Sequence, residues 1–94
     1  MAIAAILTFR GGTLERYDAL LARLGFEPGG PGPPGGLFSW VTATDEGLLV
    51  TGVWESSRAF EQFASEFGSR AAEVGVRGPP QVTIHEIHSY LTAG

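Results

Sequence analysis

The stretch of sequence that decides the fold is Leu48-Leu49-Val50-Thr51-Gly52-Val53-Trp54. Alternate residues of a β-strand point to opposite faces of its sheet. One face of this strand therefore carries Leu48 and Val50, and the other carries Leu49 and Val53. A sheet with one face in water would place polar residues on that face. Because this strand is apolar on both faces, each face needs a covering layer.

Hydrophobic periodicity and turn residues predict six elements around this stretch. In chain order they are a strand at 2–9, a helix at 14–24, strands at 37–44 and 48–55, a helix from 57 to about 74 and a strand at 81–91. The order β-α-β-β-α-β is that of ferredoxin-like domains, with two helices on one face of a four-stranded antiparallel sheet. The predicted fold class is therefore α+β, with residues 1–94 in a single domain.

Local signals support both helices. Thr13 is a suitable N-cap for the first, and Gly25 is well placed to end it. The second is capped by Ser56 or Ser57, and Gly75 could end it. The apolar stripe of the first consists of Leu14, Tyr17, Leu21 and Leu24, and that of the second of Phe60, Phe63, Ala64, Phe67, Ala71 and Val74. Such stripes bury one side of a helix against a sheet.

Ten of the twelve residues from Gly25 to Gly36 are Gly or Pro, which predicts a loop between the first helix and the second strand. The loop is either a simple connector or a flap over a pocket.

The sheet face that the helices leave open is predicted to be apolar. Contiguous apolar patches of this kind mark interfaces. A homodimer in which two such faces meet is therefore the strongest expectation about partners.

Composition excludes several classes of protein. The chain has no cysteine, which excludes disulfides and thiolate metal sites and favours a cytoplasmic location. Its formal net charge is −4, and its six basic residues are scattered arginines, so no basic stripe is available for a nucleic acid or an anionic membrane. The apolar run that ends at Arg10 is too short to span a membrane.

The densest polar cluster lies on the last predicted strand. Alternation places Glu86, His88 and Tyr90 on one face, where they could serve general acid–base chemistry on a small molecule. Alternatively, they form hydrogen bonds across the dimer interface. A shared metal site is disfavoured, because His85 and His88 are three residues apart and point to opposite faces of a strand.

Aromatic residues suggest where a planar ligand binds. Trp40 shares a strand face with Phe38 and is the better candidate for a pocket wall, whereas Trp54 directly precedes a helix cap and fits a structural role. With His85 and Phe63, these three aromatic residues complete the candidate substrate-binding set. Core packing is the alternative for each tryptophan.

The segment Val53-Trp54-Glu55-Ser56, followed by Ala59-Phe60 and a Phe-rich helix, resembles the dimeric α/β-barrel superfamily, especially its antibiotic-biosynthesis-monooxygenase-like branch. The resemblance implies a homodimeric α/β barrel with a cavity between sheet and helices in each protomer. Members oxidise polycyclic aromatics without a cofactor, degrade haem, cyclise or isomerise polyketide-like substrates, or only bind ligands.

The chain departs from the family pattern at several positions, and these departures reduce the number of family activities expected of it. Haem-degrading members use an asparagine on the first strand and a tryptophan in the second helix, but this chain has no asparagine and carries Phe63 at the tryptophan position. The missing asparagine also argues against quinone-forming monooxygenase chemistry. The expected function is a small, cofactor-free and metal-free enzyme acting on an aromatic or polyketide-like metabolite, monooxygenase-like or cyclase- or isomerase-like. The alternative is a non-catalytic homodimeric binding or accessory protein.

Overall fold

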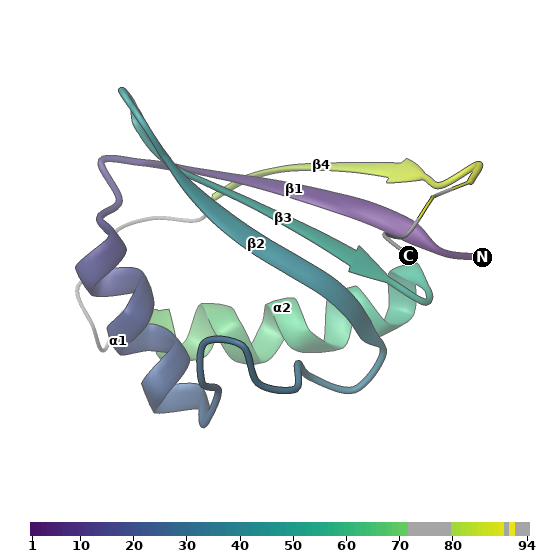
Figure 1. The fold of residues 1–94 in the computed structure, drawn as a ribbon, viewed down its shortest axis with the longest axis horizontal. Coiled ribbons are helices and arrows are strands. Elements are labelled where there is room, and N and C mark those ends of the chain that lie inside the picture. The colour runs from purple at the N-terminus through teal and green to yellow at the C-terminus, as the bar shows by residue number, and fades with distance from the viewer. Residues whose placement is uncertain (72–79, 90, 92–94) are drawn as a thin grey trace.

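The computed structural model of the chain describes residues 1–71, 80–89 and 91. Within these residues the element order is the predicted β-α-β-β-α-β (Figure 1). The elements are β1 (Ile3–Arg10), α1 (Leu14–Leu24), β2 (Gly36–Thr44), β3 (Gly47–Trp54), α2 (Ser57–Ala71) and β4 (Gln81–Glu86). The predicted end of the second helix near Gly75 lies outside the described residues.

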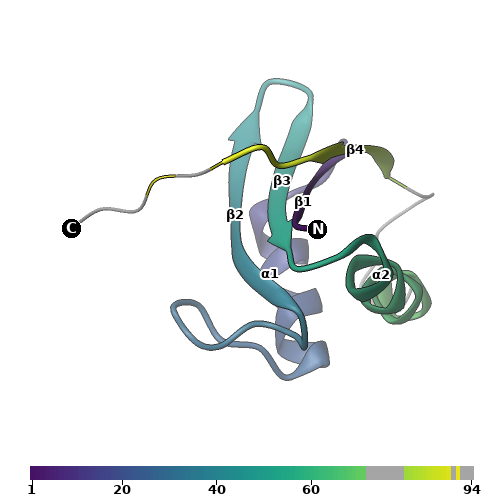
Figure 2. The same cartoon turned by 90° about the vertical axis from the view of Figure 1, so that its right-hand side faces the viewer.

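The strands of the described residues form one antiparallel sheet in the order β2-β3-β1-β4, so β2 and β4 are its edges. Both helices lie on the same side of this sheet, and the other side carries no helix within the described residues (Figures 1 and 2). The ferredoxin-like architecture predicted from the sequence is therefore confirmed.

Helix α1 has the two ends that its sequence predicts. The Thr13 hydroxyl accepts a hydrogen bond from the Arg16 backbone N–H at 3.2 Å, and Gly25 ends the helix in the left-handed region with φ of 85°. The predicted stripe is wrong at its first residue. Leu14 is 46% exposed, whereas Leu20 is fully buried, because the core-facing stripe begins one turn later, at Tyr17.

The β2–β3 hairpin turns at Asp45-Glu46, next to the end of β1. Gly47 follows with φ of 149°, and a Cβ at this position would overlap the Phe9 carbonyl oxygen. The Gly11 backbone N–H donates to the Glu46 carbonyl at 2.8 Å, which ties the hairpin to the turn after β1. The glycine thus allows the hairpin to lie directly against β1.

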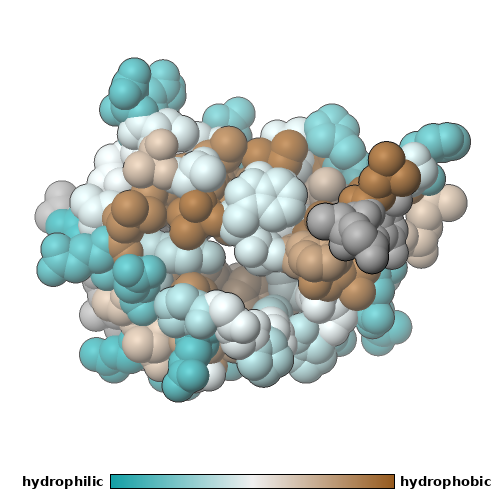
Figure 3. Space-filling model, in the orientation of Figure 1, coloured by the Kyte–Doolittle hydropathy of each residue, from teal (hydrophilic) through white to brown (hydrophobic). Residues whose placement is uncertain are grey.

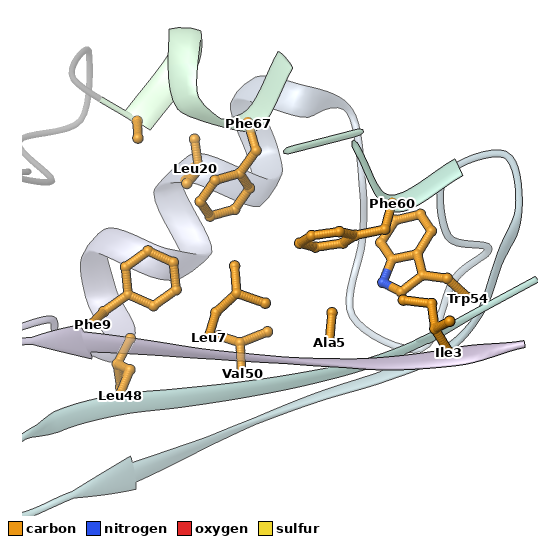
Figure 4. Packing of buried hydrophobic residues seen from close by; sticks show 11 residues of the cluster. Ile3, Ala5, Leu7, Phe9, Leu20, Leu48, Val50, Trp54, Phe60 and Phe67 are labelled. Atoms are coloured by element: carbon orange, nitrogen blue, oxygen red, sulfur yellow. The ribbon is translucent and has the colours of Figure 1, made fainter. Parts of the chain in front are cut away.

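The core fills the space between the sheet and the helices (Figure 4). Its members are Ile3, Ala5, Leu7 and Phe9 of β1, Leu20 of α1, Leu48, Val50 and Trp54 of β3, and Phe60, Phe67 and Ala71 of α2. The odd residues of β1 and the even residues of β3 therefore face the helices.

The Trp54-Glu55-Ser56 segment holds the β3–α2 junction together. Trp54 is 5% exposed and meets the Phe60 ring at a centroid distance of 5.7 Å, edge to face. The Ser56 hydroxyl accepts from the Ala59 backbone N–H at 3.2 Å and so caps α2. The Glu55 backbone N–H donates to the Gly35 carbonyl at 2.9 Å, which fixes the end of the Gly/Pro loop.

The last strand is shorter than predicted: it ends at Glu86 and not at Leu91. The physical reason is where the neighbouring strand β1 begins. Glu86 is paired with Ile3, the first residue of β1, and the Ile87 backbone N–H then donates to the Ala2 carbonyl at 3.0 Å. After this bond, residues 88 and 89 belong to no strand, and the described residues that follow β4 run away from the sheet (Figure 2).

Candidate functional site

The open face of the sheet carries three rows of side chains, which follow from the strand register. The first row is Phe38, Val53, Ala4 and His85, the second is Trp40, Thr51, Ile6 and Thr83, and the third is Thr42, Leu49, Thr8 and Gln81. The two central strands contribute four apolar residues and two threonines to this face, namely Val53, Leu49, Ala4, Ile6, Thr51 and Thr8, so the predicted apolar face is in part polar. The two aromatic residues stand at the β2 edge. Phe38 is 60% exposed and Trp40 is 52% exposed.

The other side of the sheet contains a hollow. Figure 3 shows the surface recessed between β2, α1 and the loop 25–35, with apolar surface at its base. Partly buried side chains from the surrounding elements pack against the core, namely Tyr17 and Leu24 of α1, Val41 of β2, and Phe63 and Ala64 of α2. Phe26 of the loop lies on Phe63 at a ring distance of 6.1 Å. The elements around the hollow therefore carry partly buried apolar side chains.

One polar pair interrupts these apolar surroundings. The Tyr17 hydroxyl of α1 is hydrogen-bonded to the Ser39 side chain of β2. Ser39 pairs with Gly52 in the sheet, which places it on the helix side. Burial raises the pKa of the Tyr17 phenol, the hydrogen bond from Ser39 lowers it, and the nearby Asp18 carboxylate raises it, with a net increase above the ordinary 10.0. Tyr17 is consequently neutral at physiological pH.

The structure separates the candidate substrate-binding residues into two groups. Phe38, Trp40 and His85 lie on the open face, with His85 on the opposite edge strand from the two aromatic residues. Trp54 and Phe63 lie on the helix side, with their rings 5.2 Å apart. Because the sheet stands between the groups, a single protomer does not bring all five into one cavity.

Two of the three candidate catalytic residues lie in the described part of the chain, and only Glu86 of these two lies within a strand. Glu86 is the last residue of β4 and shares the helix-side face with Ile84, although its side chain is exposed. His88 follows the end of the strand, so strand alternation no longer relates it to Glu86, and it too is exposed. Tyr90 lies outside the described residues.

Two further findings limit the kinds of site. Among residues 1–71, 80–89 and 91, no group of three or more His, Asp or Glu side chains is placed so that it could hold a metal ion. Neither helix in the described part of the chain is long and apolar enough to cross a membrane.

The Tyr17–Ser39 pair was not predicted from the sequence as a polar feature. Tyr17 belongs to the predicted apolar stripe of the first helix, and Ser39 is not among the predicted site residues. A signal existed in both elements, since a tyrosine within an apolar stripe brings a hydroxyl toward the core, and a buried hydroxyl needs a partner. Ser39 alternates with Val41 on the helix-facing side of β2 and was available to supply it.

No protein-family model and no curated protein matches the chain. Solved structures share its fold, and three of them are compared in turn. A candidate antibiotic biosynthesis monooxygenase from Chloroflexus aurantiacus is 21% identical, with all of both chains covered and a TM-score of 0.65. A monooxygenase from the gene ActVA-Orf6 of Streptomyces coelicolor, in complex with the ligand Nanaomycin D, is 16% identical over 99% of this chain and 92% of that one, with a TM-score of 0.59.

The third structure is a candidate antibiotic biosynthesis monooxygenase from Deinococcus radiodurans, 15% identical over 100% of this chain and 99% of that one, with a TM-score of 0.57. These identities are low, but the alignments extend over almost the whole of each chain. Of what the resemblance of the Trp54-Glu55-Ser56 segment implies, the ferredoxin-like fold of one protomer is thus confirmed. The chain has the ferredoxin-like fold of the antibiotic-biosynthesis-monooxygenase-like proteins.

Proposed function

We propose that this protein binds a hydrophobic aromatic or polyketide-like metabolite in the hollow between α1 and β2, and acts on it without a cofactor as a monooxygenase-like or cyclase- or isomerase-like enzyme. The observation that supports this most is the hollow itself, which combines apolar surroundings with one hydroxyl pair (Figure 3). Small-molecule sites have this composition. The Streptomyces coelicolor monooxygenase of the same fold is in complex with Nanaomycin D, which supports a ligand of this class.

The protein is proposed to work as a homodimer in the cytoplasm. Phe38 and Trp40 expose more than half of their surface on a sheet face that also carries Val53, Leu49, Ala4 and Ile6. A second copy of the same face would remove both rings from water, and such a contact is favourable roughly in proportion to the apolar area covered. His85, at the other edge of this face, is proposed to line the interface or a ligand lying within it.

In the enzymatic form of the proposal, His88 acts as the acid or base, and Glu86 and Tyr90 orient it. An imidazole exchanges protons near neutral pH, which suits it to this role. One observation favours the non-catalytic alternative. His88 follows β4, whereas the hollow lies beside β2, and these edges are three strand spacings apart, or about 14 Å. A protein that binds the metabolite without converting it would need no residue on the segment after β4.

Two measurements on the purified protein test the proposal. Native mass spectrometry reports the dimer and any co-purified small molecule in one spectrum. Oxygen uptake with anthrone tests turnover, since anthrone and O₂ give anthraquinone and water when the ring methylene is oxidised to a carbonyl.

The outcomes separate the two functions. Anthrone binding with oxygen uptake that His88→Ala abolishes, in an intact dimer, supports the enzyme. Anthrone binding without uptake would refute the monooxygenase-like form for this compound and leave the cyclase- or isomerase-like enzyme and the binding protein. A monomer at micromolar concentration that binds no aromatic compound would refute both.

A further inference from the structure

Tyr17 and Ser39 form a pair of hydroxyls that joins α1 to the β2 edge of the sheet. Tyr17 is partly buried and packs against the core, whereas Ser39 is exposed at the edge. The pair therefore links the two elements that lie on either side of the hollow, with one member partly buried and the other in contact with solvent.

The hydrogen bond between Tyr17 and Ser39 leaves other hydrogen-bonding groups of the two hydroxyls available. Each hydroxyl has one donor hydrogen and two acceptor lone pairs. The bond between Tyr17 and Ser39 uses one of the two hydrogens, whichever residue donates. One O–H donor therefore remains available to a further acceptor in either arrangement.

We propose that the Tyr17–Ser39 pair is the polar anchor of the hollow and donates this hydrogen bond to a carbonyl oxygen of the bound aromatic ligand. This inference rests on the proposed function, because it names the chemistry that the same hollow recognises. Tyr17 and Ser39 are positioning residues here, and they bind the ligand without exchanging a proton with it.

The surroundings of Tyr17 favour a neutral acceptor. Burial keeps its phenol protonated well into the alkaline range, so the group acts as a donor and not as a base. The adjacent Asp18 carboxylate, which opposes ionisation of Tyr17, also opposes a negatively charged ligand oxygen at the same place. A carbonyl oxygen accepts a hydrogen bond without bringing a charge.

Two probes of similar size and shape isolate this bond. They are 1,4-naphthoquinone, which carries two carbonyl oxygens, and naphthalene, which carries none. The chain contains no cysteine and no lysine side chain, so the quinone meets no thiol or lysine amine to which it would add. Equilibrium dialysis with absorbance detection gives the dissociation constant of each probe for the wild type, Tyr17→Phe and Ser39→Ala.

Tyr17→Phe keeps the ring and removes the hydroxyl, so it should weaken quinone binding by about three- to tenfold and leave naphthalene binding unchanged, as expected for one neutral hydrogen bond. Ser39→Ala should weaken quinone binding less, because Tyr17 keeps its donor but loses the partner that positions it. Ser65→Ala, an exposed change on α2, should bind both probes as the wild type does.

Other results would overturn the inference. Equal losses for both probes in Tyr17→Phe would mean that the hydroxyl only maintains the shape of the hollow, and no loss for either probe would mean that it has no role. If Tyr17→Phe fails to fold, an unchanged quinone affinity in Ser39→Ala would overturn the inference. Failure of the wild type to bind either probe would instead refute the proposed function, so the two failures are distinct.

Discussion

Replacing Trp40 by threonine tests whether the open face of the sheet is an interface. Trp40 is 52% exposed at the β2 edge of this face, so the fold of a single protomer does not depend strongly on it. Threonine preserves the preference for strand structure while removing the indole. The substitution should therefore affect association more than folding.

The magnitude follows from the exposed area. An aromatic side chain has about 150–250 Å² to bury, and half of this for Trp40 is about 100 Å² in each copy, or about 200 Å² in a dimer. At about 25 cal/mol per Å², covering this area contributes up to about 5 kcal/mol to association. Because threonine recovers part of this contact, we expect a loss of about 2–5 kcal/mol, which raises the dimer dissociation constant at least about thirtyfold.

Sedimentation velocity over a dilution series measures this constant for the wild type and the variant. Leu14→Thr is the matched control, since it removes a side chain that is 46% exposed on α1, on the other side of the sheet. The control should dissociate as the wild type does. An unchanged dissociation constant in Trp40→Thr, or an equal loss in Leu14→Thr, would refute the assignment of the open face.

Three further substitutions or titrations test the interior. Gly52→Ala places a Cβ 2.7 Å from the Trp54 indole nitrogen, so the indole must move. Thermal unfolding should show a loss of about 1–3 kcal/mol in the free energy of unfolding, together with a shift in tryptophan emission. An unaltered melting curve would contradict the packing of Trp54 over Gly52. Phe67 is 7% exposed and lies between the Phe9 and Phe63 rings, so Phe67→Ala leaves a cavity in the core. Urea titration should show a loss of about 3–5 kcal/mol in the free energy of unfolding. A loss below about 1 kcal/mol would contradict the place of Phe67 in the core. Tyr17 has a pKa above 10.0 in the folded protein. Its contribution to stability is therefore complete below pH 10.0 and is lost as the pH rises through the folded pKa. Unfolding measured at alkaline pH should show this loss in the wild type and not in Tyr17→Phe.

The parts of the fold that the sequence predicted well are those fixed by local interactions. Thr13 and Gly25 act within one helical turn, so their residue types alone indicate where α1 begins and ends. The assignment of Leu48 and Val50 to one face of β3 and of Leu49 and Val53 to the other was predictable for a similar reason, since alternation is a property of the strand itself. The end of β4 was different, because it depends on where β1 begins, more than 80 residues earlier in the chain.

The candidate site was harder to predict, because its groups come from separate elements. Tyr17 and Ser39 belong to a helix and a strand that the Gly/Pro loop separates, and neither residue has a distinctive neighbour in sequence. Their proximity follows from the packing of α1 against the sheet. Conversely, the string His85-Glu86-Ile87-His88 attracts attention in the sequence, but the structure extends only its first two residues along the strand.

The division of the sheet into two faces leads to a last prediction about coupling between assembly and binding. Trp40 and Ser39 are adjacent in β2 but lie on opposite faces, one on the open side and one beside the hollow. If the hollow is complete within one protomer, Trp40→Thr should change naphthoquinone affinity by less than about fivefold, the lower bound of ordinary coupling between sites. Equilibrium dialysis of the variant below its dissociation constant measures this directly. A larger loss would show that the partner protomer completes the site, and by thermodynamic linkage naphthoquinone would then strengthen the wild-type dimer by the same factor for each of its two sites.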